Sequence, residues 1–275
     1  MVDDDQLSLA INPEVPNAAR VYDYLLGGKD NFPADREVAE RVMEIAPMSR
    51  DITRQNRAFL RRVVRFLTGD AGVRQFLDIG SGLPTQGNVH EIAQAIAPDT
   101  RVVYVDNDPV VVTHGRALLA GKGTAVVRAD LREPEAVLED PQVKGFLDFD
   151  RPIALLLFSM LHFLGDDQNP DGIVARYRDA LPAGSYLALS HGSADPPPRH
   201  DLTPERAAEM AAEASRLYRQ ATIPVTNRGH AQVLRFFGDW ELVDPGLIWI
   251  QQWKPDAAKA PPPGGFYGGI ARKPG

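Results

Sequence analysis

Apolar residues in the first part of the chain recur every three or four positions, which is the spacing of one face of an α-helix. This spacing predicts a helix that opens at Pro33 and a longer helix over about residues 51–67. Gly69 is expected to end the longer helix. Ahead of these helices, residues 1–16 are expected to form a frayed acidic arm.

Beyond residue 70 the period changes, and short apolar runs alternate with helical segments. The runs are almost continuously apolar, as strands buried on both faces are. Strands that alternate with helices at this spacing predict an α/β fold with a doubly wound, mostly parallel sheet. The five predicted strands cover residues 76–79, 101–105, 125–129, 153–158 and 185–189.

The last third of the chain is expected to complete the sheet. Thr203 and Pro204 open a predicted helix that runs to about residue 218, and a shorter helix is expected over residues 231–237. The apolar runs that follow predict antiparallel strands at one edge of the sheet, at residues 240–243, 247–250 and 266–271.

Composition narrows the class of protein. The 275 residues hold 30 Lys and Arg against 37 Asp and Glu, so the formal net charge of −7 argues against nucleic acid as the main partner. The absence of cysteine excludes disulfides and thiolate zinc sites, and no His or Glu spacing indicates another metal site. The longest apolar stretch, residues 153–164, is interrupted by Ser159 and His162 and is too short to span a bilayer. Since the N-terminus is acidic, unlike a signal peptide, we expect a soluble cytoplasmic protein that does not enter a membrane.

The turn after the first strand reads Asp-Ile-Gly-Ser-Gly-Leu-Pro-Thr over residues 78–85. A dinucleotide-binding turn needs a third glycine at the position of Thr85. Pro84 also removes a backbone N–H group that a diphosphate would use. The turn is therefore not a phosphate site, although measurable binding of NADH would revive a nicotinamide-dependent oxidoreductase as an alternative.

Three aspartates follow or end consecutive strands: Asp78, Asp106 and Asp130. Because ligands of parallel sheets bind at the carboxyl ends of the strands, the three carboxylates are expected to line one crevice. They suit an adenosine with a cationic amino-acid tail: Asp78 can pair with an ammonium group, Asp106 can accept from ribose hydroxyls, and Asp130 can accept from an exocyclic amine. Two alternatives stay open, because Asp108 competes for the ribose but more naturally caps the helix beginning at Pro109, and Asp130 could simply form a turn.

The Asp-x-Gly-x-Gly turn, the two later aspartates and the Leu-Pro-Ala-Gly turn at residues 181–184 resemble the class I S-adenosylmethionine-dependent methyltransferases. The segment at residues 19–32 narrows the resemblance, together with the turn at 78–85 and Tyr-Val-Asp-Asn-Asp-Pro at residues 104–109. With these segments the chain is similar to a largely actinobacterial family of S-adenosylmethionine methyltransferases whose acceptor is not established. The resemblance covers roughly residues 16–273.

The resemblance implies a Rossmann-like sheet of seven strands within residues 70–275, with residues 1–69 forming the acidic arm and a helical lid. It implies the cofactor S-adenosyl-L-methionine, released as S-adenosyl-L-homocysteine, and methyl transfer to a small or medium-sized acceptor. Such a transfer needs no metal and no covalent intermediate. A module that binds S-adenosylmethionine without transferring its methyl group, as a sensor or scaffold, is the alternative function.

The cofactor-binding residues implied by these arguments come from the lid and from the strand ends. They are Tyr22, Asp23, Gly28, Asp78, Gly80, Ser81, Gly82, Asp106, Asn107, Asp130, Leu131 and Ser159. An acceptor that is a hydroxyl or a protonated amine would need a general base, for which His162, Tyr22 and His191 are the candidates. Each histidine could instead be a core residue bonded to the backbone, and the lid residues could form only a helix cap.

One predicted helix also carries a stripe of arginines opposite its apolar face, at Arg50, Arg54, Arg57, Arg61 and Arg65. Such a stripe could grip an anionic acceptor or a nucleic-acid backbone. Since the chain is acidic and no aromatic residue interleaves with the stripe, a solvated helix face is the expected role.

Overall fold

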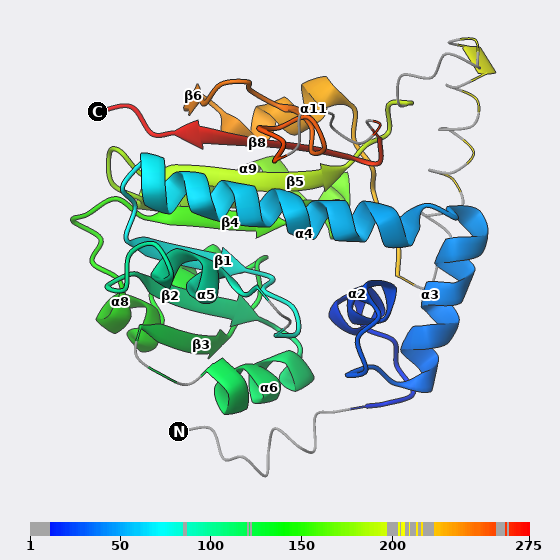
Figure 1. Cartoon of the computed structure of the whole chain (residues 1–275), viewed down its shortest axis with the longest axis horizontal. Coiled ribbons are helices and arrows are strands. Elements are labelled where there is room, and N and C mark those ends of the chain that lie inside the picture. Colours follow the sequence, from blue (N-terminus) through cyan, green and yellow to red (C-terminus); the bar gives the residue numbers. More distant parts are fainter. Residues whose placement is uncertain are drawn as a thin grey trace.

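The computed structural model describes residues 12–84, 87–119, 121, 123–196, 203, 205, 206, 209, 213, 216, 223–256, 262 and 264–275. Its centre is a sheet in the order β3-β2-β1-β4-β5-β8-β6, with β7 paired to β8 beside β6 (Figure 1). The strands are β1 (Gln75–Ile79), β2 (Arg101–Asp106), β3 (Thr124–Arg128), β4 (Ala154–Phe158), β5 (Tyr186–Gly192), β6 (Glu241–Leu242), β7 (Ile248–Trp249) and β8 (Phe266–Arg272).

The pairing of the strands confirms the predicted doubly wound sheet. The first five strands are parallel, and β8 runs antiparallel to β5 along its whole length. The short strands β6 and β7 both pair antiparallel with β8, so together they fill the seventh position of the sheet. The predicted antiparallel edge is therefore present, but β6 and β7 are only two residues long each.

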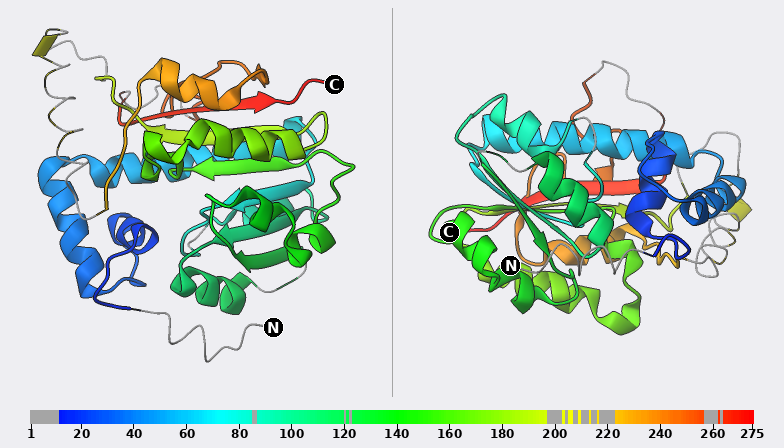
Figure 2. Two further views of the ribbon diagram at one scale, coloured as in Figure 1. Left: turned by 180° about the vertical axis from the view of Figure 1, so that it is seen from behind. Right: turned by 90° about the horizontal axis from the view of Figure 1, so that it is seen from below.

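Helices cover both faces of the sheet. In Figure 1, α4 lies across one face, which also packs against α5 and α6, while Figure 2 shows the other face from behind. That second face packs against α7, α8, α9 and α11. The helices are α2 (Ala18–Leu26), α3 (Pro33–Ile45), α4 (Ser49–Arg65), α5 (Val89–Gln94), α6 (Pro109–Leu119), α7 (Pro134–Leu138), α8 (Pro141–Phe146), α9 (Pro170–Ala180) and α11 (His230–Leu234).

The longest helix ends differently from the prediction. Gly69 does not stop α4, because the chain continues through it as a π-helix over Phe66–Asp70. A glycine ends a helix by taking up a left-handed conformation. Here Gly72 does so, with a φ of 71°, and the buried side chain of Leu67 holds the extra turn against the core. The predicted helix over residues 203–218 lies largely outside the described residues.

The first two helices of the described chain form a separate layer beyond the carboxyl ends of the parallel strands (Figure 1). Helices α2 and α3 pack on each other through Val21, Leu25, Val38 and Ala39. Asn17 caps α2, since its side-chain oxygen accepts a hydrogen bond from the backbone N–H of Ala19. The space between this layer and the strand ends is where the candidate site lies.

Candidate functional site

A cavity of about 710 Å³ separates the N-terminal helices from the strand ends. Its wall comes from α2, α3 and α4, from the loops after β1, β2, β4 and β5, and from residues 223–227. A smaller cavity of about 190 Å³ adjoins it at the ends of β2 and β3. Both cavities are lined by Gly80, Asp106, Asn107, Met160 and Phe163, so they are neighbouring parts of one site.

The turn after β1 places two glycines in the left-handed region, Gly80 with a φ of 72° and Gly82 with a φ of 67°. The space beside Gly80 is filled by the protein itself, because a Cβ atom there would lie 2.0 Å from the sulfur of Met160. A Cβ atom on Gly82 would meet nothing within 4 Å. The sequence analysis placed both glycines among the cofactor-binding residues. In the structure, Gly80 makes room for the side chain of Met160, which follows β4.

The carboxylate of Asp106 is buried at the end of β2 and lines both cavities. It accepts hydrogen bonds from the backbone N–H groups of Gly82 at 2.9 Å and Asp108 at 3.0 Å. Burial raises the pKa of its carboxyl to about 6. Asp108 instead caps α6, as expected, since its carboxylate accepts from the N–H of Val110 at 2.7 Å. Asp106 thus faces the cavity, whereas Asp108 caps a helix, so Asp106 is the better placed of the two for the ribose.

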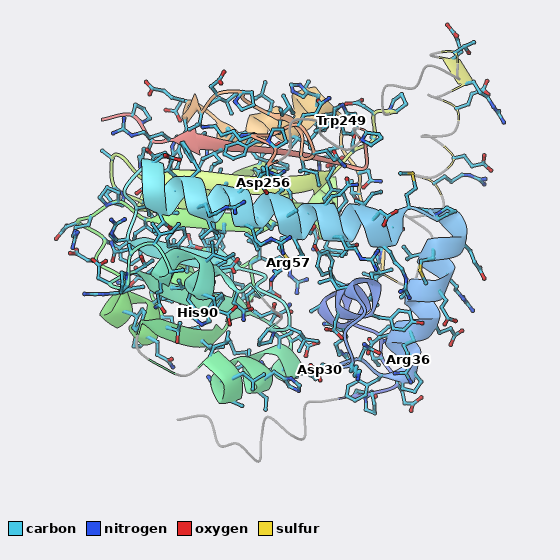
Figure 3. The ribbon with its side chains drawn as sticks, viewed as in Figure 1. Asp30, Arg36, Arg57, His90, Trp249 and Asp256 are labelled. Atoms are coloured by element: carbon cyan, nitrogen blue, oxygen red, sulfur yellow. The ribbon has the colours of Figure 1, made fainter. Side chains whose placement is uncertain are left out.

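Asp78 lies one strand away and also lines the main cavity. Burial raises the pKa of its carboxyl to about 7, and the nearby guanidinium of Arg57 opposes that shift. Arg57 extends from α4 on the side of β1 and α2 (Figure 3). Asp78 and Asp106 therefore face the same cavity, as their positions at neighbouring strand ends predicted. The sequence did not predict that burial brings both pKa values near neutrality.

Asp130 lines only the smaller cavity, and its oxygens are already engaged. One oxygen accepts from the backbone N–H and the Nε of Arg132, each at 2.9 Å, and the other accepts from Asn107 at 3.0 Å. Arg132 holds the pKa of the carboxyl at about 2. Asp130 therefore forms a turn, while its carboxylate still lines the smaller cavity beside the buried apolar side chain of Leu131.

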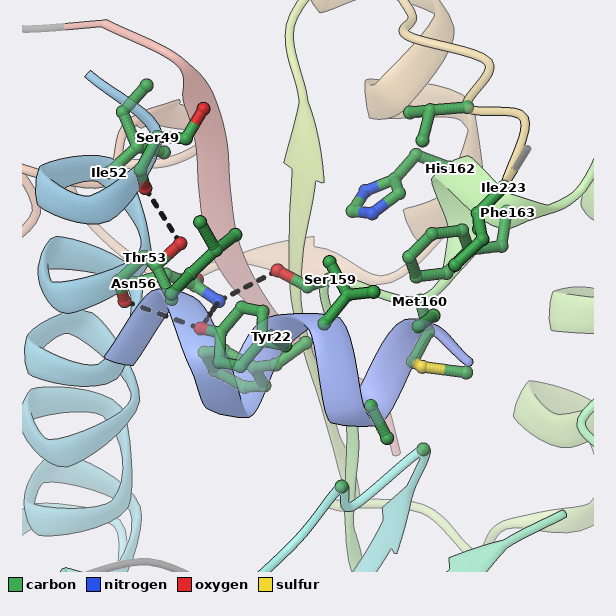
Figure 4. A pocket seen from close by; sticks show the side chains of 18 of the residues that line it. Tyr22, Ser49, Ile52, Thr53, Asn56, Ser159, Met160, His162, Phe163 and Ile223 are labelled. Atoms are coloured by element: carbon green, nitrogen blue, oxygen red, sulfur yellow. Dashed lines mark hydrogen bonds between the residues drawn. The ribbon is translucent and has the colours of Figure 1, made fainter. Parts of the chain in front are cut away.

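Tyr22, Asn56 and Ser159 form a hydrogen-bonded cluster in the wall of the main cavity (Figure 4). The amide nitrogen of Asn56 donates to the Tyr22 hydroxyl at 3.0 Å and to the Ser159 hydroxyl at 2.8 Å. The Tyr22 hydroxyl donates to the carbonyl of Thr53 at 3.3 Å, and burial raises its pKa. The backbone of Ser159 has a φ of 55°, in the left-handed region. Residues other than glycine rarely adopt this conformation, and those that do are concentrated at functional sites.

Asp23 and Gly28 have structural roles in the loop after α2. One carboxylate oxygen of Asp23 accepts from the backbone N–H of Asp30 at 3.0 Å and from the side chain of Asn31 at 2.9 Å. A Cβ atom on Gly28 would lie 2.0 Å from the other oxygen, so this glycine makes room for Asp23. Asp23 lines the cavity, whereas Gly28 is not among the lining residues of either cavity.

The two histidine candidates differ. His162 lines the main cavity, and burial lowers its pKa well below the ordinary value, which leaves the ring neutral. His191 is fully buried behind it and is not among the lining residues. Its Nδ1 bonds the carbonyl of Gly192 at 2.8 Å and its Nε2 bonds Arg228 at 3.1 Å. His191 is therefore not placed to act as a base, since both of its ring nitrogens are hydrogen-bonded within the core.

The sequence analysis did not single out four of the residues that line the main cavity: Asn56, Met160, Phe163 and Asp195. The sequence held a signal for Asn56, because it is one of three polar residues, with Ser49 and Thr53, on the buried face of α4. Arg57 belongs to the arginine stripe, which does not act as one surface.

The stripe divides between the cavity and solvent. Arg54 pairs with Asp51, and Arg65 pairs with Asp256 at the exposed surface, as a solvated helix face would. Only Arg57, among the described lining residues, brings a guanidinium into the cavity.

None of the His, Asp or Glu side chains of the described residues form a group of three that could hold a metal ion. No helix within the described ranges combines the length and the apolar character needed to cross a membrane.

Comparison with known proteins relates the chain to two close structures. Residues 4–274 match the family described as S-adenosyl methyltransferase. A protein of Thermobifida fusca YX that has been proposed to be a methyltransferase is 44% identical, with 95% of this chain and 96% of that chain covered and a TM-score of 0.85. A DUF574 family protein of Streptomyces avermitilis MA-4680 is 41% identical, with 95% and 99% covered and a TM-score of 0.86.

A more distant structure shares the fold alone. Human N-acetylserotonin methyltransferase, crystallised with S-adenosylmethionine, is 15% identical with a TM-score of 0.50, over 98% of this chain and 66% of that chain. No curated protein matches the chain.

Proposed function

The chain belongs to the S-adenosyl methyltransferase family, and from that premise we propose that it transfers a methyl group from S-adenosylmethionine to a small or medium-sized acceptor held in the same cavity. The observation that carries the proposal is the pair of buried carboxylates, Asp78 and Asp106, at neighbouring strand ends beside a glycine turn. The main cavity, at about 710 Å³, lies within the range of roughly 300–1,000 Å³ that is usual for ligand pockets. It therefore has room for a cofactor with part of a second molecule.

The charge of the cavity wall fits a cationic cofactor. Among the described residues that line the main cavity, four carry a carboxylate and one carries a guanidinium. A sulfonium and an ammonium group on one ligand would offset the cost of burying this negative charge. The carboxylates are Asp23, Asp78, Asp106 and Asp195, and the guanidinium is that of Arg57.

We assign the parts of the cofactor to the two cavities by their chemistry. Asp106 would accept the ribose hydroxyls, and Asp78 would pair with the ammonium group of the amino-acid tail. The smaller cavity, with Asn107 on one side and Leu131 on the other, would take the adenine ring. Gly82 leaves open space for the ligand at the turn.

S-adenosylmethionine supplies a methyl group that its sulfonium already activates, so the protein's part is to orient the reactants and exclude water. Helices α2 and α3 cover the cavity from outside, as a lid would. His162 is neutral in its buried position, and its Nδ1 accepts a hydrogen bond from the backbone N–H of Gly192 at 3.4 Å. The ring proton then lies on Nε2, so His162 would orient an acceptor by donating a hydrogen bond to it, and its lowered pKa makes it a weak base. The amide of Asn56 holds the hydroxyls of Tyr22 and Ser159 in the same wall.

Two measurements test the proposal. Isothermal titration of the full chain with S-adenosylmethionine is expected to show one site, and a labelled methyl group is expected to pass to an acceptor in a metabolite panel. The absence of binding at millimolar S-adenosylmethionine would contradict the proposal. Tight binding without transfer to any acceptor would instead support a sensor or scaffold.

A further inference from the structure

The part of the main cavity away from the glycine turn has an apolar wall and a carboxylate at its edge. We propose that the methyl acceptor is an apolar molecule without an anionic group, whose protonated or hydrogen-bond-donating end pairs with Asp195. This inference rests on the proposed function, because it takes the same cavity as the place where the acceptor binds.

The apolar wall is built mainly from elements other than the strand ends that carry Asp78 and Asp106, which we call the cofactor half of the cavity. Its side chains come from α3, from α4, from the segment at residues 223–225 and from the start of β8. They offer no donor to a phosphate or carboxylate, so an acceptor gains affinity here by burying apolar surface. The residues are Val38, Val42, Ile52, Ile223, Val225 and Phe266.

Asp195 is held in place from one side only. One of its carboxylate oxygens accepts from the backbone N–H of His230 at 2.7 Å and from the hydroxyl of Tyr267 at 3.0 Å. Burial, together with the Asp195 carboxylate, raises the pKa of Tyr267 to about 12, so this hydroxyl keeps its proton. Within the described part of the chain, the other oxygen has no hydrogen bond and the carboxylate has no ion pair with Lys or Arg. A partly buried carboxylate in this state favours a cationic or donating partner.

The distribution of charge disfavours an anionic acceptor. Arg57 is the one cation among the described residues that line the main cavity, and it lies near Asp78 on the cofactor side. An anion in the apolar half would meet Asp195 without a compensating charge, and like charges brought together in a desolvated site repel strongly.

The test uses three probes of one ring size: 2-naphthylmethylamine, which is protonated at neutral pH, 2-naphthol and 2-naphthoate. Each is titrated calorimetrically into the full chain, with and without S-adenosylhomocysteine. We expect the amine and the naphthol to bind, and the naphthoate to bind at least about tenfold more weakly. Naphthoate that binds as tightly as the amine, or an amine and a naphthol that both fail to bind, would overturn the inference.

Asp195→Asn isolates the role of the carboxylate. The amide oxygen can still accept from Tyr267 and His230, so the local structure is expected to remain. Binding of the amine should weaken about tenfold, while the matched control Asp239→Asn, at a side chain that is 88% exposed, should leave it unchanged. Unchanged binding of the amine to Asp195→Asn would overturn the inference. Should S-adenosylhomocysteine fail to bind, the proposed function fails, while the probes on the unliganded chain still test Asp195.

Discussion

At the scale of single residues, Asp106 joins the glycine turn to the end of β2 through its bond to the N–H of Gly82. Asp106→Ala should therefore weaken binding of S-adenosylmethionine by about 2–4 kcal/mol, since it removes a charged acceptor from two buried hydroxyls. Calorimetry measures the change, and Asp99→Ala, at a side chain that is 77% exposed, is the control. Affinity within threefold of the wild type would show that the ribose lies elsewhere.

The pH dependence of binding is a second prediction at this scale. The pKa of Asp78 is about 7 and that of Asp106 about 6, because burial disfavours their charged forms. A cationic ligand binds the ionised carboxylates, so affinity for S-adenosylmethionine should rise as the pH rises from 5.5 to 8. Asp78→Asn should remove the upper part of this rise, as calorimetry at several pH values would show. Affinity that does not change with pH would contradict the assignment.

The same raised pKa values should make the folded protein less stable as the pH rises, whereas they make ligand binding stronger. In the unfolded chain both carboxyls titrate near 4, so at intermediate pH the folded protein binds more protons than the unfolded one. Their contribution to stability is therefore fully present below pH 4 and is lost as the pH rises through 6 to 7. In the absence of ligand, Asp78→Asn should show a smaller loss of thermal stability over this range than the wild type. An identical loss in both proteins would contradict the raised pKa of Asp78.

The residues at the strand ends were predictable because a parallel sheet brings consecutive carboxyl ends to one edge. Asp78 and Asp106 follow directly from that rule. What fills the space beside Gly80 was not predictable, because Met160 reaches it from the loop after β4, far along the sequence. Asp195 was missed for the same reason: no local pattern marks a residue whose neighbours come from other parts of the chain.

At the scale of the elements, buried charges fasten the N-terminal helices to the sheet. Arg20 on α2 is 5% exposed and lies 3.4 Å from the carboxylate of Asp35 on α3 and 3.3 Å from that of Asp108 at the start of α6. Its guanidinium also lies over the ring of Phe32, 5.0 Å from the centroid. The periodicity of the sequence predicted α3 and α4, but not this contact, which joins residues that only the fold brings together.

Arg20→Met should loosen α2 and α3 from the sheet without unfolding the sheet. Removing one partner leaves two buried carboxylates uncompensated, at a cost of about 3–5 kcal/mol. Hydrogen exchange should speed up across residues 12–48, whereas amides of the central strands should stay protected, and S-adenosylmethionine should bind more weakly. The control is Arg41→Met on α3, since that side chain is 67% exposed and pairs only with Glu37 in the described structure. Equal protection of residues 12–48 in the wild type and Arg20→Met would reject this role for the buried charges.

At the scale of the whole molecule, the sheet and the N-terminal helices divide the site between them. The sheet supplies the glycine turn and the carboxylates, and the alternation of apolar runs and helices predicts its doubly wound, mostly parallel character. The opposite wall comes from α2, α3 and α4 and from segments beyond β5. These elements are brought together only by long-range packing. This is why the sequence predicts the strand-end wall of the cavity better than the opposite wall.

The most direct test of the account is a crystal structure of the protein with S-adenosylhomocysteine. We predict that both ribose hydroxyls lie within hydrogen-bonding distance of Asp106, with the adenine ring in the smaller cavity beside Leu131. Electron density for the product anywhere else, or cavities that stay empty in crystals grown with millimolar product, would contradict the central claim that these strand ends hold the methyl donor.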